Sequence, residues 1–584
     1  MLVQGPIKRK SWLLTILRAA SESRPWSKLK GMVLPTRWGK RIAKAKTNNP
    51  VSNQPSLFML SYTSTFMIWL ILLGLLFRLW RFSQVPASLY WDEVAVGLDA
   101  RALIQTGRDL SGGSWLQPLF FSYGDYKAPV YIWLTTILGK LAGVSELTVR
   151  LPSLLASLTT AYLVYRLVKL VSAKNSRLPQ LALANFLIMP WAAHFGRVGM
   201  ESHLSLTFLT LAVYLVVAAA KTRHPFKLVL SSLAVSAGIF TYISLRLVGP
   251  ALFIAAFIIY HKKNLRPSLP AFTAGLGVII LSSLILLKSP DYSLSQRYRL
   301  SNDNLVTSTT HITAAARAQG ENPDLLSRLV NHRYVFKVRE YLTNYSTHFS
   351  PDFLFISGDA NLRHHSGFGG ELLLAQGVLV IFGLLALVGN LRPEAWLILV
   401  WAALSPAVAS LVNEVPHAGR SIYLIVPLAW LTALGTEELI ILFKKNSRRL
   451  ASAAIVVVLA VNFLAYAHDY FIHYPARSQL AWLNPYKQAA LYFKDRPPEQ
   501  KTYVTAQWFQ PGLYFAFYQD VPATKLQATD NQYLLEYDSY QFSLAGAVCP
   551  ENSLCVVPAD WKEDITTKAS DIPGTLLLVV KTAK

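Results

Sequence analysis

Residues 61–82, SYTSTFMIWLILLGLLFRLWRF, form an apolar run of the length that crosses a lipid bilayer. Similar runs of roughly 18 to 22 residues recur along the chain, and each fits the thickness of a bilayer core. The chain has 584 residues, of which 53% are hydrophobic and 15% are charged. A soluble domain carries more charge, about a quarter of its residues. The sequence therefore predicts a polytopic α-helical membrane protein.

The formal net charge of +24 is spread unevenly along the chain. Residues 1–60 contain twelve Lys or Arg and one acidic residue, Glu22, whereas residues 468–584 contain ten basic and twelve acidic residues. Basic residues otherwise gather in short loops, as they do on the cytoplasmic side of membrane proteins. We therefore predict that residues 1–60 form a basic cytoplasmic segment of a protein of the cytoplasmic membrane. Most aromatic residues lie inside apolar runs and not beside basic residues, so no nucleic-acid partner is expected.

About eleven spans are predicted within residues 61–467, together with one segment of uncertain path, 128–145. This segment is short and contains Lys140. If it spans, the next basic loop falls outside; if it re-enters or lies at the interface, all later basic loops fall in the cytoplasm. The charge distribution favours the second choice, and it places the loops 83–148 and 288–371 outside. The predicted spans are 61–82, 149–171, 178–196, 202–220, 228–245, 247–260, 269–287, 372–389, 394–412, 421–440 and 450–467.

The long outer loop 288–371 is expected to carry helices of its own, because long loops without secondary structure are uncommon. Its Arg363-His364-His365 run could contact a phosphate or be solvated, and we favour the solvated state.

The composition changes after Ala467, and residues 468–584 are predicted to form a small α/β domain. Residues 502–506 and 575–581 are strand candidates. With eleven spans, this C-terminal domain is extracytoplasmic. Both cysteines of the chain, Cys549 and Cys555, fall in it, as a disulfide in an oxidising compartment would. Two free thiols are the alternative.

Two adjacent acids, Asp92 and Glu93, follow the first span in the loop 83–148. A carboxylate at a membrane face can take a proton from a bound hydroxyl without being buried in lipid. The alternative is a surface helix with acids in its first turn, where they favour the helix dipole. Farther along the loop, Asp125 and Lys127 could bind a metal and a phosphate respectively, or form a polar turn.

Further ionisable residues fall at the predicted outer ends of the spans. Any one of them is typical of an interface anchor, whereas together they suit an anionic lipid head group. They are Arg150, Arg197, Glu201, Tyr242, Arg246, His417 and Arg420.

At these residues the chain resembles the membrane glycosyltransferases of the GT-C class. It is most similar to the family 39 group, which includes protein O-mannosyltransferases and the aminoarabinose transferases of lipid A. Three motifs carry the resemblance, and the similarity of architecture extends to about residue 470. They are Trp91-Asp92-Glu93, Asp125-Tyr-Lys127-Ala-Pro129 and Val149-Arg150-Leu-Pro152-Ser153.

The resemblance implies an inverting transfer of a sugar from a polyprenyl-phosphate donor to a hydroxyl of a protein, lipid or glycan acceptor. Asp92 would then be the general base and Glu93 would support it. Lys127 would meet the lipid phosphate, helped by Arg150 and Arg246.

One motif departs from the family pattern. The aminoarabinose transferases have Glu-Lys-Pro where this chain has Asp125-Tyr-Lys127-Ala-Pro129, so we assign no metal ligand and leave a divalent metal open. No Gly-rich nucleotide loop is apparent, and no nucleotide cofactor is expected.

Two other functions compete with the transferase. A transporter or flippase of a lipid-linked sugar would show broken helices in paired repeats, and segment 128–145 has no clear counterpart. A noncatalytic relative that acts as a scaffold is the other alternative.

Overall fold

The structure is a computed structural model. It describes residues 57–122, 125–261, 268–301, 305, 308–320, 324–388, 392–412, 414–495, 497–527, 536–543, 550, 553–558, 569–572 and 576–581. Residues 1–56 of the predicted basic segment lie outside this part of the chain, as does Cys549.

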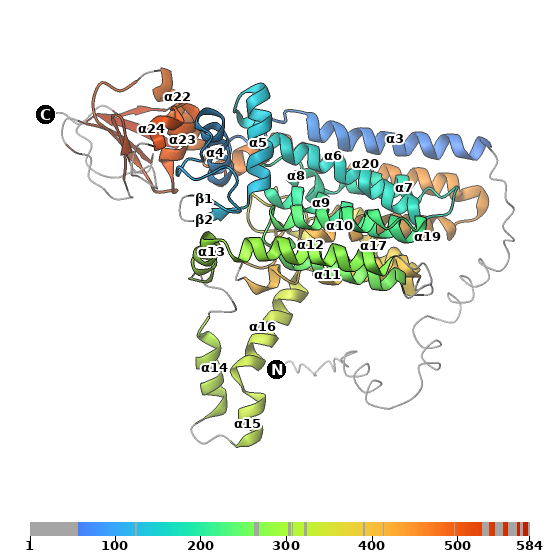
Figure 1. Cartoon of the computed structure of the whole chain (residues 1–584). Helices are drawn as coiled ribbons and strands as arrows, with labels where there is room; N and C mark the ends of the chain where they lie inside the picture. The colour runs from blue at the N-terminus through green and yellow to red at the C-terminus, as the bar shows by residue number, and fades with distance from the viewer. Residues whose placement is uncertain are drawn as a thin grey trace, which may run out of the picture.

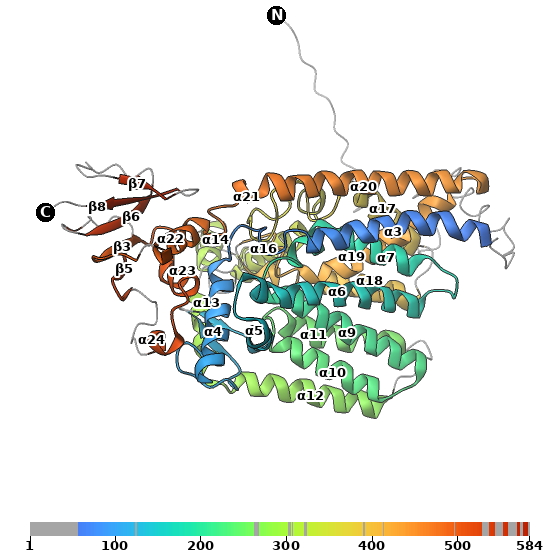
Figure 2. The same ribbon diagram turned by 90° about the horizontal axis from the view of Figure 1, so that it is seen from above.

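Apolar helices run side by side in one bundle that makes up most of the molecule (Figures 1 and 2). Each predicted span coincides with a bundle helix, and the span predicted at 178–196 is divided into two helices before Pro190. The bundle helices are α3 (Leu57–Leu79), α6 (Glu146–Val171), α7 (Leu178–Ile188), α8 (Pro190–Phe195), α9 (Glu201–Thr222), α10 (Phe226–Ile239), α11 (Leu245–Tyr260), α12 (Leu269–Leu287), α17 (Leu374–Val388), α18 (Pro393–Leu404), α19 (Ile425–Ile441) and α20 (Arg448–Ile472).

Within the described residues, six helical segments are long and apolar enough to cross a membrane. They are Glu146–Val171, Glu201–Thr222, Leu269–Leu287, Pro393–Leu411, Ile422–Ile441 and Lys445–Ile472. Several shorter apolar helices lie among them. The predicted class of polytopic helical protein is confirmed, while the number of eleven spans stays a prediction.

Glycines let two bundle helices approach closely. A Cβ atom on Gly435 of α19 would lie 1.8 Å from the carbonyl oxygen of Leu379, and one on Gly383 of α17 would lie 2.1 Å from that of Leu431. No larger residue fits at either position without moving a backbone. This is the close packing through small residues that is typical of membrane helices.

Two helices lie across one end of the bundle and not along it (Figure 1). They are α4 (Trp91–Thr106) and α5 (Pro129–Ala142), joined by the antiparallel hairpin of β1 (Phe120–Ser122) and β2 (Asp125–Lys127). We call this end of the bundle the domain end, because the C-terminal domain lies there too. Helix α5 lies within the segment 128–145, and the interfacial or re-entrant path of this segment stays a prediction.

The loop 288–371 carries helices, as predicted. They are α13 (Pro290–Ser301), α14 (Thr310–Gln319), α15 (Leu325–Val330), α16 (Arg333–Thr347) and the π-helical turn η3 (Asp352–Ile356). Helices α14 to α16 project sideways from the bundle near its domain end (Figure 1). Short 3₁₀ turns follow or precede the later spans, at η4 (Ala409–Leu411), η5 (Ile422–Leu424) and η6 (Lys445–Ser447).

The C-terminal region combines helices with a six-stranded sheet of order β4-β5-β3-β6-β8-β7. The central strand β3 pairs parallel with β5 and β6, and β8 pairs antiparallel with β6 and β7. The elements are α21 (Tyr474–Arg477), α22 (Asn484–Asp495), β3 (Thr502–Thr505), α23 (Pro511–Tyr518), α24 (Ala523–Gln527), β4 (Glu536–Tyr537), β5 (Tyr540–Ser543), β6 (Leu554–Pro558), β7 (Ala569–Asp571) and β8 (Leu577–Lys581). Both strand candidates are confirmed, as β3 and β8.

The cysteine in β6, Cys555, is disulfide-bonded. Its expected partner Cys549 lies outside the described residues, so the pairing itself stays a prediction.

Candidate active site

The two adjacent acids of α4 point in different directions, because neighbouring residues of an α-helix are about 100° apart around its axis. Glu93 points into the protein and is 1% exposed. Its Oε1 accepts hydrogen bonds from Arg150 Nε at 3.1 Å and from the backbone N–H of Gly199 at 2.6 Å. Its Oε2 accepts from the backbone N–H of Tyr90 at 2.8 Å. Glu93 therefore fixes the first turn of α4 to α6 and to the start of α9.

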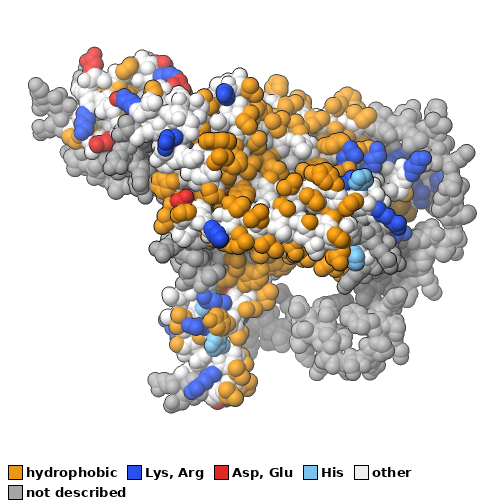
Figure 3. Space-filling model, in the orientation of Figure 1, with side chains coloured by type: hydrophobic (Ala, Val, Ile, Leu, Met, Phe, Trp, Pro, Cys, Tyr) orange, Lys and Arg blue, Asp and Glu red, His pale blue; other side chains and the backbone are white. Residues whose placement is uncertain are grey.

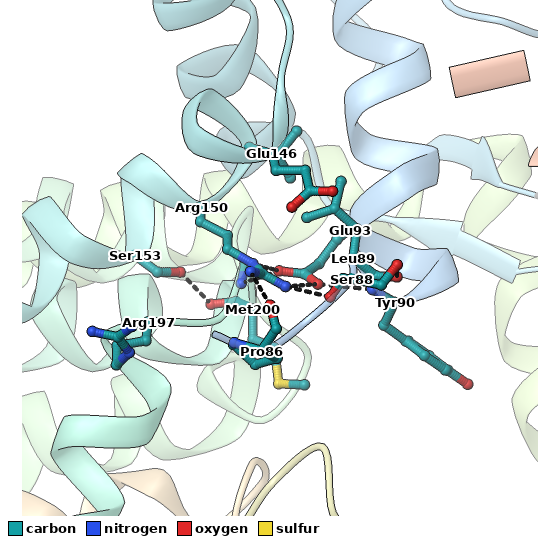
Figure 4. A network of polar contacts seen from close by, with 12 residues as sticks. Pro86, Ser88, Leu89, Tyr90, Glu93, Glu146, Arg150, Ser153, Arg197 and Met200 are labelled. Atoms are coloured by element: carbon teal, nitrogen blue, oxygen red, sulfur yellow. Dashed lines mark hydrogen bonds and ion pairs between the residues drawn. The ribbon is translucent and has the colours of Figure 1, made fainter. Parts of the chain in front are cut away.

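Arg150 is the buried partner of Glu93 and has no exposed surface (Figure 4). Its remaining donors reach the backbone carbonyls of Pro86 and Ser88, so each guanidinium nitrogen has an acceptor. Arg150 thus holds the segment before α4 in place. The resemblance implied a phosphate contact for Arg150, which would require this network to open.

Asp92 lies on the open side of α4, with a side chain that is 39% exposed. One of its carboxylate oxygens is paired with Nζ of Lys127. The Lys127 side chain is 6% exposed, and its Nζ lies 5.3 Å from the centre of the Trp91 ring. The WDE motif and the YKAP motif therefore meet at this ion pair.

The β1–β2 hairpin explains why Asp125 and Lys127 act together. Residues two apart in a strand point to the same face, while Tyr126 points to the other face and packs on Phe121. Burial would lower the pKa of Lys127, but the carboxylates of Asp92, Glu201 and Asp125 outweigh it and raise that pKa. The structure therefore brings four predicted site residues together around one protonated amine.

Arg197 has a different place, at the end of α3. Its guanidinium donates to the backbone carbonyls of Phe77, Arg78, Arg81 and Val85. These are carbonyls of the kind that a helix leaves unsatisfied at its C-terminus. Arg197 is fully buried and caps α3.

Tyr242 and Arg246 lie where α10 turns into α11. The Arg246 guanidinium lies 5.8 Å from the ring centre of Tyr292 in α13. The backbone carbonyl of Phe240, in the same turn, accepts a hydrogen bond from Val130 at the start of α5. The turn is thus tied to the segment that follows Lys127.

His417 belongs to a buried group of histidines around Asp359. Asp359 Oδ2 accepts from His364 Nδ1 at 3.1 Å and from the backbone N–H of Ala418 at 2.8 Å. The rings of His364 and His417 lie 4.5 Å apart, and the backbone N–H of His417 donates to His348 Nε2 at 3.2 Å. We call His348, His364, His365 and His417 the histidine cluster.

The prediction that the run at 363–365 is solvated was wrong for its two histidines. His364 is 9% exposed and His365 is 2% exposed. The loop before α17 folds against the turn at 414–421, which lies about fifty residues away in sequence and has no local pattern that reveals the contact. The sequence contains no signal for this contact between distant segments, so the burial of the two histidines could not be predicted from it.

The histidine cluster also contains the residues best placed to hold a metal ion. Among the described residues, donor atoms of Asp359, His364 and His417 lie within 4.8 Å of one another. However, His417 Nδ1 accepts a hydrogen bond from the backbone N–H of Arg420 at 3.2 Å. A neutral His417 then carries its proton on Nε2 and offers no lone pair there. Hydrogen bonds account for the group, and we assign no metal to it.

Two arginines beside the cluster are not matched by carboxylates. The Arg363 guanidinium lies 3.9 Å from the ring centre of Tyr90, two residues before Asp92. Burial, the neighbouring His364 and the charge of Arg420 all lower the pKa of His417, and Arg363 adds to this effect. In the described part of the chain, neither Arg363 nor Arg420 has a carboxylate within ion-pair distance. Arg420 was a predicted site residue, whereas Arg363 was considered for a phosphate contact but predicted to be solvated.

Comparisons with known proteins agree with this architecture. Residues 126–286 match the family model described as dolichyl-phosphate-mannose-protein mannosyltransferase. The fold is similar to that of ArnT from Cupriavidus metallidurans in the apo state, with a TM-score of 0.51 and 13% identity over 89% of this chain and 98% of that chain. The oligosaccharyltransferase of Archaeoglobus fulgidus gives a TM-score of 0.47 and 12% identity over 80% of this chain and 64% of its own. No curated protein sequence matches the chain.

The family match and the shared fold confirm the resemblance that the three motifs carried. The chain is an integral membrane protein, and residues 126–286 carry the match to this family model. It has the fold of the GT-C glycosyltransferases, with a sheet-containing domain at its C-terminal end.

Proposed function

We propose that this protein is an inverting glycosyltransferase. It moves a sugar from a polyprenyl-phosphate donor to an acceptor hydroxyl at the outer face of the cytoplasmic membrane. The observation that carries the proposal is the pair of Asp92 and Lys127 on the open side of α4. Arg363 and Arg420 supply positive charge nearby, without carboxylate partners among the described residues.

The reaction follows from the chemistry of these groups. Asp92 takes the proton of the acceptor hydroxyl, and the oxygen attacks the anomeric carbon on the face opposite the phosphate. The bond between that carbon and the phosphate oxygen breaks, and polyprenyl phosphate leaves with the electron pair. One attack from the opposite face inverts the configuration.

Each cation has a distinct task in this scheme. Lys127 holds the Asp92 carboxylate in place through their ion pair and stays protonated itself, because the carboxylates of Asp92, Glu201 and Asp125 raise its pKa. Arg363 and Arg420 bind the phosphate and stabilise the charge that grows on it as the bond breaks. Glu93 and Arg150 position α4, and therefore Asp92, through their buried contacts.

The donor class follows the matched family, whose description names a dolichyl-phosphate sugar. A lipid phosphate is a good leaving group once cations neutralise it, so the enzyme needs mainly to orient the acceptor and remove its proton. The acceptor is a hydroxyl of a protein, a lipid or another glycan. In this arrangement the N-terminus is cytoplasmic, and the domain end with the C-terminal domain is extracytoplasmic.

The proposal is tested by release of polyprenyl phosphate from a panel of polyprenyl-phosphate sugars. Purified wild type, Asp92→Asn and the matched control Asp495→Asn, at the exposed end of α22, are compared in detergent with a membrane extract as acceptor source. Loss of a general base costs about 10²- to 10⁴-fold in rate, so Asp92→Asn should lose most activity while the control keeps it. Equal release by all three would remove Asp92 as base. Movement of intact donor across vesicles without release would replace the transferase with a transporter.

A further inference from the structure

Helices α14, α15 and α16 form a lateral arm, residues 308–320 and 324–347, whose role the proposed reaction does not explain. The arm extends across the direction of the bundle helices, close to the domain end (Figure 1). Two hydrogen bonds tie the ends of α14 and α15 together at its tip: Gln319 Nε2 donates to the carbonyl of Asn331 at 3.1 Å, and Asn331 Nδ2 donates to that of Ala318 at 3.1 Å. The arm is therefore a helical hairpin that is held together by its own hydrogen bonds.

One side of α16 is apolar and exposed. Val335, Val338 and Leu342 recur at the spacing of one helix face, and their exposed fractions are 46%, 57% and 57%. Phe349, just beyond the end of the helix, is 39% exposed. Helix α15 continues this surface with Leu325, Leu326 and Leu329, which are 74%, 68% and 63% exposed. A surface of this kind on a protein face marks an interaction site and does not suit water.

The space-filling view shows hydrophobic side chains gathered on the arm, with basic and histidine side chains among them (Figure 3). The described acids of the arm are Asp324 and Glu340, against five exposed or half-exposed cations. These cations are Arg317, Arg328, Arg333, Lys337 and Arg339. An apolar face beside an excess of cations fits a surface of anionic lipid, where each basic side chain near the head groups adds to binding.

The root of the arm fixes its level along the bundle. Tyr345 Oη donates to the carbonyl of Ala403 at 2.7 Å, and Tyr341 Oη donates to that of Ala407 at 3.2 Å. These contacts hold the C-terminal half of α16 against the end of α18 and the turn that follows it. Both carbonyls lie in the second half of the apolar segment Pro393–Leu411, which is long enough to span. The root of the arm thus lies beside the half of this segment that ends at Leu411, and the arm extends sideways from there.

We propose that the lateral arm lies in the interface of the outer leaflet, with its apolar side in the upper acyl region and its cations at anionic head groups. The arm connects on one side to α13, which packs beside β2, and on the other to the loop of Asp359. Its contact with lipid would then set the height of both segments, and of the site between them, above the membrane. The inference does not depend on which reaction the site performs.

The test uses the full chain with a single added cysteine that carries an environment-sensitive fluorophore. Leu329→Cys and Leu342→Cys probe the apolar side, and Thr343→Cys is the matched control, exposed on the next position of α16. Labelling without reductant leaves the disulfide of Cys555 intact. The proteins are placed in nanodiscs of phosphatidylcholine, with or without phosphatidylglycerol.

We expect lipids with a spin label near the head group to quench the fluorophore at Leu329 and Leu342, and aqueous iodide to quench it at Thr343. Equal quenching by iodide at all three positions would overturn the proposal, because the arm would then stand in water. Energy transfer between labelled copies, with protection from iodide that persists in detergent, would also overturn it by identifying a second copy as the partner.

The charge of the arm is tested by Arg317→Glu combined with Arg333→Glu, both exposed. This variant should lower lipid quenching at Leu329 in nanodiscs with phosphatidylglycerol, and leave it unchanged in phosphatidylcholine alone. The same quenching in both lipids before and after the change would refute the role of anionic head groups.

Discussion

Glu93 and Asp92 are neighbours in sequence, yet the structure gives them opposite properties. Glu93 is buried and accepts four hydrogen bonds, and its partner Arg150 has no exposed surface. Asp92 is half-exposed and has one ion pair. The acid that ties α4 to α6 and the acid proposed as the general base are thus adjacent on one helical turn. The side of α4 that faces the bundle decides which of the two acids is buried and which is exposed.

The two acids should therefore separate stability from activity when each is neutralised. Glu93→Gln leaves Arg150 buried without a counter-charge, and breaking such a pair costs about 3–5 kcal/mol. Asp92→Asn should keep the thermal unfolding temperature near that of wild type while it loses turnover. Unfolding of the purified proteins in detergent, followed beside activity, distinguishes the two. A stable but inactive Glu93→Gln would instead place Glu93 in the chemistry.

Substitution of Arg363 or Arg420 should change the kinetic constants for the lipid donor more than those for the acceptor. We expect Arg363→Ala and Arg420→Ala to lower kcat/KM for the lipid donor by about 10- to 1000-fold, because a cation at a leaving phosphate stabilises the transition state. Lysine at either position should restore part of this loss as a point charge. Arg108→Ala, an exposed residue of the loop after α4, is the control. An effect confined to the KM of the acceptor would contradict a phosphate site.

At the scale of elements, α4 connects the site to the C-terminal domain. Arg101 donates to the carbonyls of Ala516 and Phe517 at 3.1 and 2.9 Å, on the side of the helix away from the bundle. Gly97 faces the Phe517 ring so closely that a Cβ atom would lie 2.5 Å from it. The sheet-containing domain therefore supports the helix that carries Asp92.

A larger residue at Gly97 should displace α23, and with it the contact between α4 and the C-terminal domain. Gly97→Val forces the Phe517 ring or the whole of α23 to shift, at a cost of about 1–3 kcal/mol for overpacking. We expect a lower unfolding temperature and lower turnover, although Asp92 is unchanged. Gly277→Ala in α12 is the matched control, because nothing lies within 4 Å of a Cβ there. Full activity of Gly97→Val would separate the domain from the chemistry.

The histidine cluster should make the stability of the loops around it depend on pH. Burial lowers the pKa of His365 to about 4, from an ordinary value of 6.5, and burial also lowers that of His417. Unfolded histidines bind protons more readily than these folded ones, so the stability they contribute is complete above pH 6.5 and falls as the pH drops toward 4. After correction for the intrinsic exchange rate at each pH, the protection of residues 359–371 from hydrogen exchange should fall as the pH drops over this range. Protection that stays constant would show that the histidines are not buried neutral.

The sequence predicted most helices and two strands, because apolar runs and their periods are local properties. It could not predict the contacts that define the site. The Arg363 run could be read as solvated because nothing near it in sequence shows that the turn at His417 covers its neighbours. Arg150 and Arg197 were placed at the site by sequence, whereas their acceptors are backbone carbonyls of distant segments. Such acceptors exist only after the chain has folded.

At the scale of the whole molecule, the structure gathers Asp92, the lateral arm and the C-terminal domain at one end of the bundle (Figures 1 and 2). The proposed lipid-linked donor reaches the membrane surface at a fixed height, so the proposed base, Asp92, must lie at that height too. Helix α4 and strand β2 carry Asp92 and Lys127 at the domain end of the bundle. The reaction then depends on which side of the membrane this end faces.

The side of the membrane that the domain end faces can be tested with thiol labelling in intact cells. A cysteine at Asp495, in the C-terminal domain, should react with a membrane-impermeant maleimide from outside once the outer permeability barrier is removed. A cysteine at Lys221, exposed in the last turn of α9 beside the basic loop that follows, should react only after the cytoplasmic membrane is permeabilised, because basic loops stay inside. The reverse pattern would turn the domain end toward the cytoplasm. The donor would then have to be used on the side where nucleotide sugars are available, and the need for a lipid-linked sugar would disappear.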